Sequence, residues 1–334
     1  MLVLPKSETS LSELLYEVRR IEKHREILTE DKIRKIYESL MEDLKAFLSD
    51  EYIKYADEEG RLYVPTLVEK SRYAKFLEEI AKRVDSISPE LKKEITKVVD
   101  LTYKEAYKGM AKAVKKAKNT QEIAEMVSDT FVRPEVLKQA VNNNISKLTL
   151  PRVLEKHRQE VIYQIQQELN IGLINGDRYE TIAKRIQDRV GVGYSKAANI
   201  VRTESHRNLE AGFMDCAENI QKGLEGSGLI YTATWKTAKD ERVRPQRRYK
   251  TKKGWKTSIS RNGANHQKME GVTVKAGELF NLGNGIKTKT PGKSGSAAND
   301  CNCRCDLSYD LMTVEEFAEA TNQTPEQVRK KYKM

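Results

Sequence analysis

The sequence predicts a mostly α-helical protein with a small α+β domain near its C-terminus. An extended helical N-terminal region is expected to precede a basic, β-rich and loop-rich module. Three observations support this: helical periodicity over the first 222 residues, a change of pattern at Gly226–Gly228, and positive charge confined to the segment that follows. The 334 residues are 33% charged and 38% hydrophobic, which favours extended helical surface over one large core.

The N-terminal half is expected to form consecutive helices. Leu11, Leu14, Leu15 and Val18 recur at helical spacing, and Ser10 with Glu13 fits a capping box. Ser88-Pro89-Glu90 is a helix start, with proline at the first helical position and an acid at the positive helix end. Further helices are predicted to begin near Thr66, Asn119, Arg133 and Pro151.

Residues 178–222 are predicted to form two amphipathic helices joined by a turn at Gly191 and Gly193. Such a pair is either an ordinary helical hairpin or a DNA-binding helix-turn-helix.

After Gly228, alternating apolar residues from Leu229 to Trp235 predict a strand. Capping boxes at Thr313 and Thr324 predict two short C-terminal helices. The expected division is a helical N-terminal region over 1–150, a helical part over 151–225, the basic β-rich module over 226–308 and a helical tail over 309–334.

The net charge of +11 is located in one segment. Residues 1–230 have a net charge of +1, whereas residues 231–300 contain 16 basic and 5 acidic side chains. Residues 245–265 hold seven basic and no acidic side chains, together with Tyr249 and Trp255. Cations follow a phosphate backbone and aromatic rings stack on bases, so this composition indicates nucleic acid; a solvated loop is the alternative. The candidate nucleic-acid-binding residues are Arg242, Arg244, Arg247, Arg248, Lys250, Lys252, Lys253, Trp255, Lys256 and Arg261.

Cys301, Cys303 and Cys305 form a cluster with one-residue spacing, which is tighter than in most structural zinc sites. In extended backbone Cys303 and Cys305 point to the same side, so both could reach one metal ion. His266 is a candidate third ligand, and Asp240 could supply an oxygen. A structural zinc ion would suit a module with few apolar residues. The alternatives are reduced thiols in a small core, a labile disulfide, or a catalytic cysteine paired with His266.

Several protein classes are not expected. The sequence has no run of 18 apolar residues, no secretory signal pattern, and too few cysteines for a disulfide scaffold. It also lacks a Walker loop, a dinucleotide-binding glycine motif and a His-Glu-x-x-His motif. No catalytic residues are predicted, and the chain is expected not to be an enzyme.

An ordered series of motifs resembles the head-morphogenesis domain of tailed-phage minor head proteins, the Mu F-like family, over about residues 150–308. The series comprises Arg202-Thr203-Glu204, Trp235, Asp240 with Arg242-Val243-Arg244, His266 with Gly271, and Asn302-Cys303-Arg304-Cys305. In the family the arginine segment usually runs into the histidine after a few residues, whereas here the stretch 245–265 separates them.

The resemblance implies a minor capsid protein of the virion that associates with the portal vertex, takes part in head assembly and influences DNA packaging or ejection. The implied partners are the portal protein, double-stranded DNA bound without sequence preference, and scaffold or major capsid protein, with no membrane. The implied location is inside the head at the portal vertex, and the host cytoplasm during assembly. Some relatives carry fused toxin or transferase domains, for which the 28 residues after Asp306 are expected to be too short. The alternative functions are a metal-dependent enzyme acting on nucleic acid or protein, and a DNA-binding regulator that uses the 178–222 hairpin.

Overall fold

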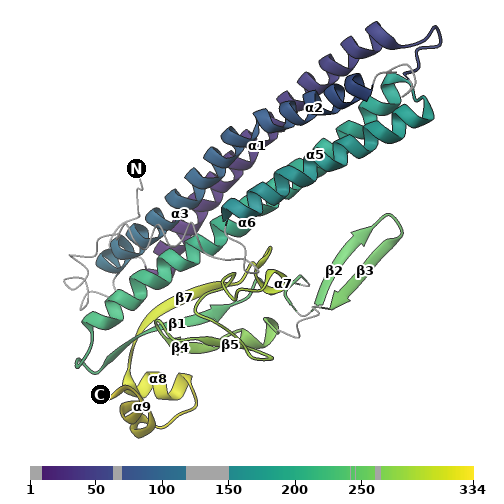
Figure 1. Cartoon of the computed structure of the whole chain (residues 1–334). Helices are drawn as coiled ribbons and strands as arrows, with labels where there is room; N and C mark the ends of the chain where they lie inside the picture. Colours follow the sequence, from purple (N-terminus) through teal and green to yellow (C-terminus); the bar gives the residue numbers. More distant parts are fainter. Residues whose placement is uncertain (1–9, 63–69, 118–149, 241, 245, 260–264) are drawn as a thin grey trace. The chain divides into compact units, whose positions relative to one another are not determined.

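The computed structural model describes residues 10–62, 70–117, 150–240, 242–244, 246–259 and 265–334. Long helices are followed by short strands and two C-terminal helices, which confirms the predicted fold class (Figure 1). The long helices are α1 (Leu11–Tyr55), α2 (Lys70–Ser86), α3 (Ser88–Lys116), α5 (Leu150–Asn175) and α6 (Tyr179–Gly223). The helix starts predicted near Thr66, Asn119 and Arg133 lie outside the described residues.

The shorter elements follow Gly228, where the change of pattern predicted them. They are β1 (Leu229–Lys236), β2 (Gln246–Thr251), β3 (Gly254–Ile259), the 3-10 helix η3 (Gln267–Met269), β4 (Thr273–Lys275), β5 (Phe280–Gly283), β6 (Ile286–Thr288), α7 (Ala297–Asp300), β7 (Asp306–Thr313), α8 (Val314–Ala320) and α9 (Pro325–Tyr332). Both predicted C-terminal capping boxes are formed, at Thr313 with Glu316 and at Thr324 with Gln327.

The chain divides into two compact units that are discontinuous in sequence. One unit contains Ile27–Lys97 and Thr149–Val201, and is called the helical unit below. The other contains Met1–Glu26, Val98–Leu148 and Arg202–Met334, and is called the mixed unit. Helices α1, α3 and α6 each contribute residues to both units, so these units differ from the contiguous division drawn from composition.

In the helical unit, apolar side chains recurring at helical spacing form the core. Ile33, Leu40 and Leu44 of α1 are buried, as are Ile80 of α2 and Ile186 of α6. Burial of such side chains is the main favourable contribution to the free energy of folding here.

Helix α6 passes through Gly191 and Gly193 without a break, so the predicted turn at these glycines is wrong. A Cβ atom at Gly193 would lie 3.1 Å from both the Tyr37 ring and the Val161 side chain. Glycine at this position therefore permits close helix packing, which a sequence pattern does not distinguish from a turn. The helical hairpin of residues 178–222 does not exist, and the regulator hypothesis that required it loses its basis.

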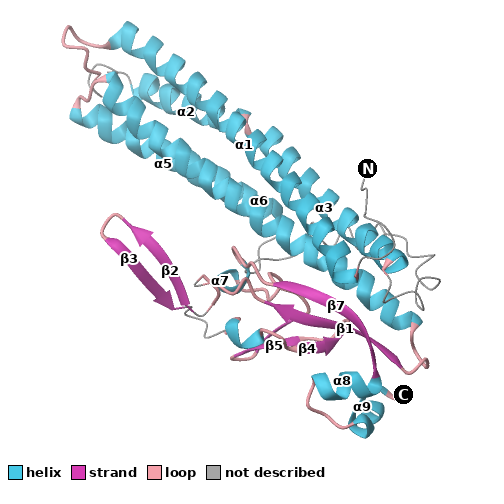
Figure 2. Ribbon diagram, turned by 180° about the vertical axis from the view of Figure 1, so that it is seen from behind, coloured by secondary structure: helices cyan, strands magenta, loops and turns pink. Residues whose placement is uncertain are grey.

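In the mixed unit, β1 is the central strand of an antiparallel three-stranded sheet with the order β4-β1-β7 (Figure 2). Tyr231 and Trp235 of β1 share one buried core with Phe213 of α6 and Met110 of α3. The approach of α6 to α3 is close, since a Cβ atom at Gly212 would lie 2.6 Å from the Tyr103 carbonyl oxygen. The sheet, α6, α3 and the start of α1 therefore share a single core.

A buried ion pair joins three elements of this unit. The Glu210 side chain on α6 is fully buried, and its carboxylate lies 3.0 Å from the Arg19 guanidinium of α1. The same carboxylate accepts the backbone N–H of Leu307 in β7 at 3.1 Å, and Arg19 donates to the Leu307 carbonyl at 2.8 Å. A buried carboxylate requires such partners, because an unpaired charge carries a large desolvation cost.

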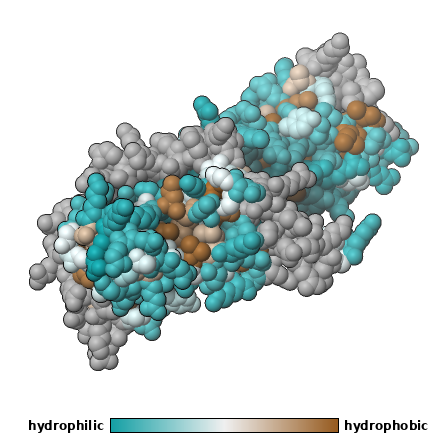
Figure 3. Space-filling model, turned by 90° about the horizontal axis from the view of Figure 1, so that it is seen from below, coloured by the Kyte–Doolittle hydropathy of each residue, from teal (hydrophilic) through white to brown (hydrophobic). Residues whose placement is uncertain are grey.

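No helix among the described residues is long and apolar enough to cross a membrane. On the face shown in Figure 3, hydrophilic residues surround smaller hydrophobic patches.

In the helical unit, His157 of α5 is 5% exposed, and its Nε2 atom lies 2.7 Å from the Tyr37 hydroxyl. Its Nδ1 atom is buried without a hydrogen-bond partner among the described residues. Burial, reinforced by the nearby positive charge of Lys196, lowers the pKa of His157 from 6.5 to about 4. The neutral imidazole is therefore the form compatible with the folded state.

We predict that acid selectively destabilises the helical unit through His157. His157 takes up a proton near pH 6.5 in the unfolded state but only near pH 4 in the folded state. The stabilising contribution of the neutral, buried imidazole is therefore complete above pH 6.5 and is lost as the pH falls toward 4. The loss reaches about 3 kcal/mol, at about 1.4 kcal/mol per pKa unit. Chemical denaturation from pH 7 to 4.5 should show a shallower decline for His157→Gln than for the wild type. His24→Gln, at an exposed position, is the control, and an equal decline in all three proteins would contradict the prediction.

Candidate metal centre

The cysteine segment begins with a turn at Cys301 and Asn302 and then leads through Cys303, Arg304 and Cys305 into β7, with alternating exposure. Cys303 and Cys305 are buried, whereas Asn302 before them and Arg304 between them are exposed. Arg304 forms an ion pair with Asp240 on the outer side. The two thiols therefore point to the same side, as the one-residue spacing predicted.

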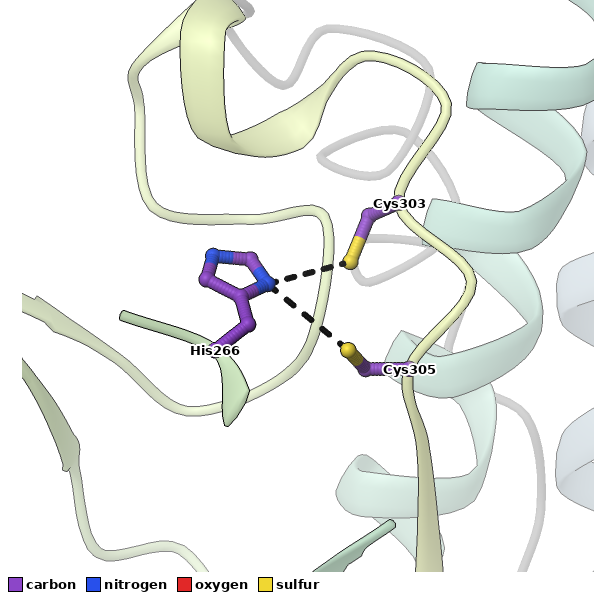
Figure 4. Close-up of side chains that lie close together, drawn as sticks. All are labelled: His266, Cys303 and Cys305. Carbon is purple, nitrogen blue, oxygen red and sulfur yellow. Dashed lines mark hydrogen bonds between the residues drawn. The ribbon is translucent and has the colours of Figure 1, made fainter. Parts of the chain in front are cut away.

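His266 completes a compact cluster with these thiols. It immediately precedes η3 and is 1% exposed, and its Nδ1 atom lies 3.7 Å from the sulfur of Cys303 and 3.7 Å from that of Cys305 (Figure 4). The three ligand atoms all lie within 4.8 Å of one another. The Trp235 ring stands edge-on to the imidazole at 5.6 Å between centroids, so the ring is held by apolar packing.

The pKa values of the two thiols shift in opposite directions. The Cys305 thiol and the imidazoles of His206 and His266 lower the pKa of Cys303 well below its ordinary value, against the effect of burial. The Cys303 sulfur raises the pKa of Cys305, and burial raises it further. One thiolate beside one thiol is the arrangement expected when two like charges cannot both be accommodated.

His206 is a neighbour of this cluster that the sequence analysis did not identify. Burial acts to lower its pKa, but Cys303 and the carboxylates of Asp306 and Glu210 together raise it to about 9. Its Nε2 atom is buried and has no hydrogen-bond partner within the described part of the chain. His206 also groups with Glu210 and Asp306 at ligand distances.

Helix α6 also contacts the cysteine segment through a hydrogen bond. Thr203 accepts the backbone N–H of Asn302 at 3.3 Å, where Asn302 has a positive φ of 53°. Glu204 forms a buried ion pair with Arg207, and burial raises the pKa of Glu204 to about 7. Glu204 and His206 therefore serve different contacts, as their separation of two helical positions indicates.

Two candidate ligands do not join the cluster. Cys301 is outside the group formed by His266, Cys303 and Cys305, and its carbonyl oxygen accepts a hydrogen bond from Arg244 at 2.7 Å. Asp240 is engaged with Arg304 and with the backbone N–H of Arg242. The structure therefore brings together three of the five candidate ligands, and Cys301 and Asp240 are not among them.

Arg244 does not suit the DNA contact predicted for it. It is 3% exposed, and its guanidinium donates to the carbonyl oxygens of Ala298 at 2.6 Å and Cys301 at 2.7 Å. Arg244 therefore fixes the chain that leads into the cysteine segment. Charge alone in the sequence could not separate this internal role from a surface role.

The other predicted DNA-binding residues lie in or beside a β-hairpin. Arg247, Arg248 and Lys250 belong to β2, and Trp255 and Lys256 belong to β3. Arg242 is exposed, as are Lys252 and Lys253 at the turn of the hairpin. Arg261 lies outside the described residues.

Comparisons with known proteins match the motif-bearing part of the chain. The family described as Phage Mu protein F like protein matches residues 163–308. The minor head protein GP7 of Bacillus phage SPP1 is 29% identical over 285 residues, covering 84% of this chain and 81% of that protein. No solved structure matches at a significant level.

A second relative carries an enzyme name. The NAD(+)–arginine ADP-ribosyltransferase EFV of Enterococcus faecalis is 24% identical over 278 residues, which cover 83% of this chain. This chain spans 50% of the length of that protein.

These matches, together with the fold and the ordered motifs from Arg202 to Cys305, confirm the predicted resemblance to the Mu F-like family over residues 163–308. Over 84% of its length the chain is also similar to a phage minor head protein.

We predict that Arg244→Met lowers the free energy of unfolding by about 2–4 kcal/mol, because two charge-assisted hydrogen bonds are lost in a buried place. Arg242→Met removes the same charge from an exposed side chain and serves as the control. Equal midpoints for the two variants in urea denaturation would show that Arg244 has no such internal role.

Proposed function

We propose that this protein is a phage minor head protein that docks on the phage portal vertex during head assembly and contacts packaged DNA through the β2–β3 hairpin. The single observation that carries the DNA contact is the placement of the basic stretch on a separate two-stranded β-ribbon. β2 and β3 pair with each other over six residue pairs and form their own sheet, separate from β4-β1-β7.

The hairpin combines positive charge, aromatic residues and the narrow shape of a two-stranded ribbon. The turn is Lys252-Lys253, followed by Gly254 with a φ of 109°, and both lysines are exposed. The register places Lys250 opposite Trp255 and Tyr249 opposite Lys256, so cationic and aromatic residues are adjacent across the ribbon. Two-stranded ribbons are narrow enough to enter the major groove of DNA. Contacts made mainly to phosphate would give affinity without sequence preference.

The structure also supports an insertion that leaves the remaining module undisturbed. The hairpin lies between Arg244 and His266, and the backbone N–H of Gln267, the residue after His266, donates to the Arg244 carbonyl oxygen at 3.0 Å. The chain therefore leaves and re-enters the module at nearly the same place. A DNA-contacting ribbon can be added there without altering the core of the mixed unit.

Docking on the portal is proposed for the protein as a whole, by similarity to minor head proteins. Residues 1–230, with a net charge of +1, are better suited to contacts with protein than with DNA. The proposed location is accordingly the virion head, at the portal vertex. The chain is given no catalytic role, and the transferase activity named for the Enterococcus faecalis protein is not carried over.

The DNA contact predicts that replacing Arg247, Arg248, Lys252 and Lys253 by glutamine weakens binding to any duplex. The slope of log affinity against log salt should flatten by up to about 3–4, since each lost phosphate contact removes about 0.9. Replacing the exposed Lys108, Lys112, Lys115 and Lys116 of α3 by glutamine removes the same charge and is the matched control. Fluorescence anisotropy with two duplexes of unrelated sequence measures the affinity of the hairpin variant and of the control variant at several salt concentrations. Equal losses in the two variants would mean that net charge, and not the hairpin, controls binding.

The portal contact predicts that the full chain co-purifies with the portal protein of the same phage genome when the two are co-expressed. Because the contact is assigned to the nearly neutral residues, the four-glutamine hairpin variant should co-purify equally well. Failure of the wild-type chain to co-purify would overturn the portal proposal while leaving the DNA measurement intact.

A further inference from the structure

We propose that the mixed unit binds one Zn²⁺ ion through Nδ1 of His266 and the sulfur atoms of Cys303 and Cys305. This assignment differs from the ligand set suggested by the sequence, because Cys301 is not among the ligands. It does not depend on the DNA or portal proposals.

The observed distances match the edges of a tetrahedral zinc site. Bonds of about 2.3 Å to sulfur and about 2.0–2.1 Å to nitrogen place neighbouring N and S ligands roughly 3.6 Å apart in a tetrahedron. The two N···S distances from His266 are both 3.7 Å. The three atoms therefore already lie on one face of the required polyhedron (Figure 4).

Hydrogen bonds explain the close approach of His266 Nδ1 to two sulfur atoms less well than a bound cation does. The Nδ1 atom of an imidazole has a single lone pair or a single proton, so it can make one good hydrogen bond to one sulfur. Here two sulfurs lie at the same distance from that atom. Both thiols are free, and a cation is the species that three converging donor atoms of this kind bind in common.

His206 of helix α6 is a neighbour of this site and is not assigned as a ligand. Its ring nitrogen groups with the carboxylates of Glu210 and Asp306, and not with the three donor atoms of the proposed site. The same two carboxylates lie 3.0 Å and 3.9 Å from the guanidinium of Arg19, so they already have a cation of the protein as partner.

The donor atoms select the metal. Thiolate and imidazole are the ligands that zinc prefers, whereas magnesium and calcium prefer oxygen. Three protein ligands leave the fourth tetrahedral position of the ion to water or another small ligand. The ion would tie the segment before η3 to the cysteine segment that enters β7, in a unit whose three-stranded sheet is small.

The first experiment uses the full chain purified with reductant. We expect one zinc per chain by elemental mass spectrometry, and a Co²⁺-exchanged protein with intense visible bands typical of tetrahedral coordination and a near-ultraviolet thiolate charge-transfer band. Removal of the ion by a chelator should lower the melting temperature. A wild-type chain without bound zinc and without these Co²⁺ bands overturns the proposal, as does a Cys303–Cys305 disulfide in the protein isolated without reductant.

Variants then assign the ligands. Cys303→Ser, Cys305→Ser and His266→Gln should each lose stoichiometric zinc, whereas Cys301→Ser retains it and is the matched control. Circular dichroism checks that each variant keeps its helices. The Co²⁺ spectrum of the wild type tests for the metal site even if a variant fails to fold. Equal zinc content in Cys303→Ser and Cys301→Ser would also overturn the site.

Discussion

The carboxylate of Glu210 is fully buried and must be paired, and its partners come from distant parts of the chain. Arg19 from α1 and the backbone N–H of Leu307 from β7 both reach it. Taking away one partner of such a pair leaves an uncompensated buried charge, at a cost of about 3–5 kcal/mol. The start of α1, the second half of α6 and the last strand of the sheet are therefore constrained to meet at this point. The apolar core containing Phe213 and Trp235 packs around the same meeting point.

This constraint has a functional consequence, because it fixes the cysteine segment next to α6. Asp306 follows Cys305 directly and reaches the same arginine as Glu210. Once β7 is in register with β1, Cys303 and Cys305 face His266 and lie near His206. Arg244 secures the other side of the segment through the carbonyl oxygens of Ala298 and Cys301. The motif residues His266, Cys303 and Cys305 therefore form one cluster that neighbouring elements hold in place, and the basic ribbon β2–β3 forms a separate sheet.

The two proposed activities make different demands on the protein. A metal cluster requires buried, precisely held ligands, and these are drawn from the segment before η3 and the segment before β7. A contact with phosphate requires exposed cations on a separate element, which the β2–β3 ribbon provides at Lys252 and Lys253. Charge in this chain is thus divided by element, and only part of the basic segment faces solvent.

The sequence alone determined the fold class, the strand after Gly228, the capping boxes at Thr313 and Thr324, the common side of Cys303 and Cys305, and the family. These features depend on local periodicity, local hydrogen bonds and an ordered set of motifs, all of which can be read within a few turns of chain. Only the tertiary structure decided that Gly193 lies inside a continuous helix, that Arg244 is buried, and that Cys301 is outside the cluster of His266, Cys303 and Cys305. Each of these depends on what packs against the residue from a distant segment. Sequence spacing does not contain that information, because a glycine, an arginine or a cysteine has the same local pattern whether its neighbour is solvent or another part of the chain.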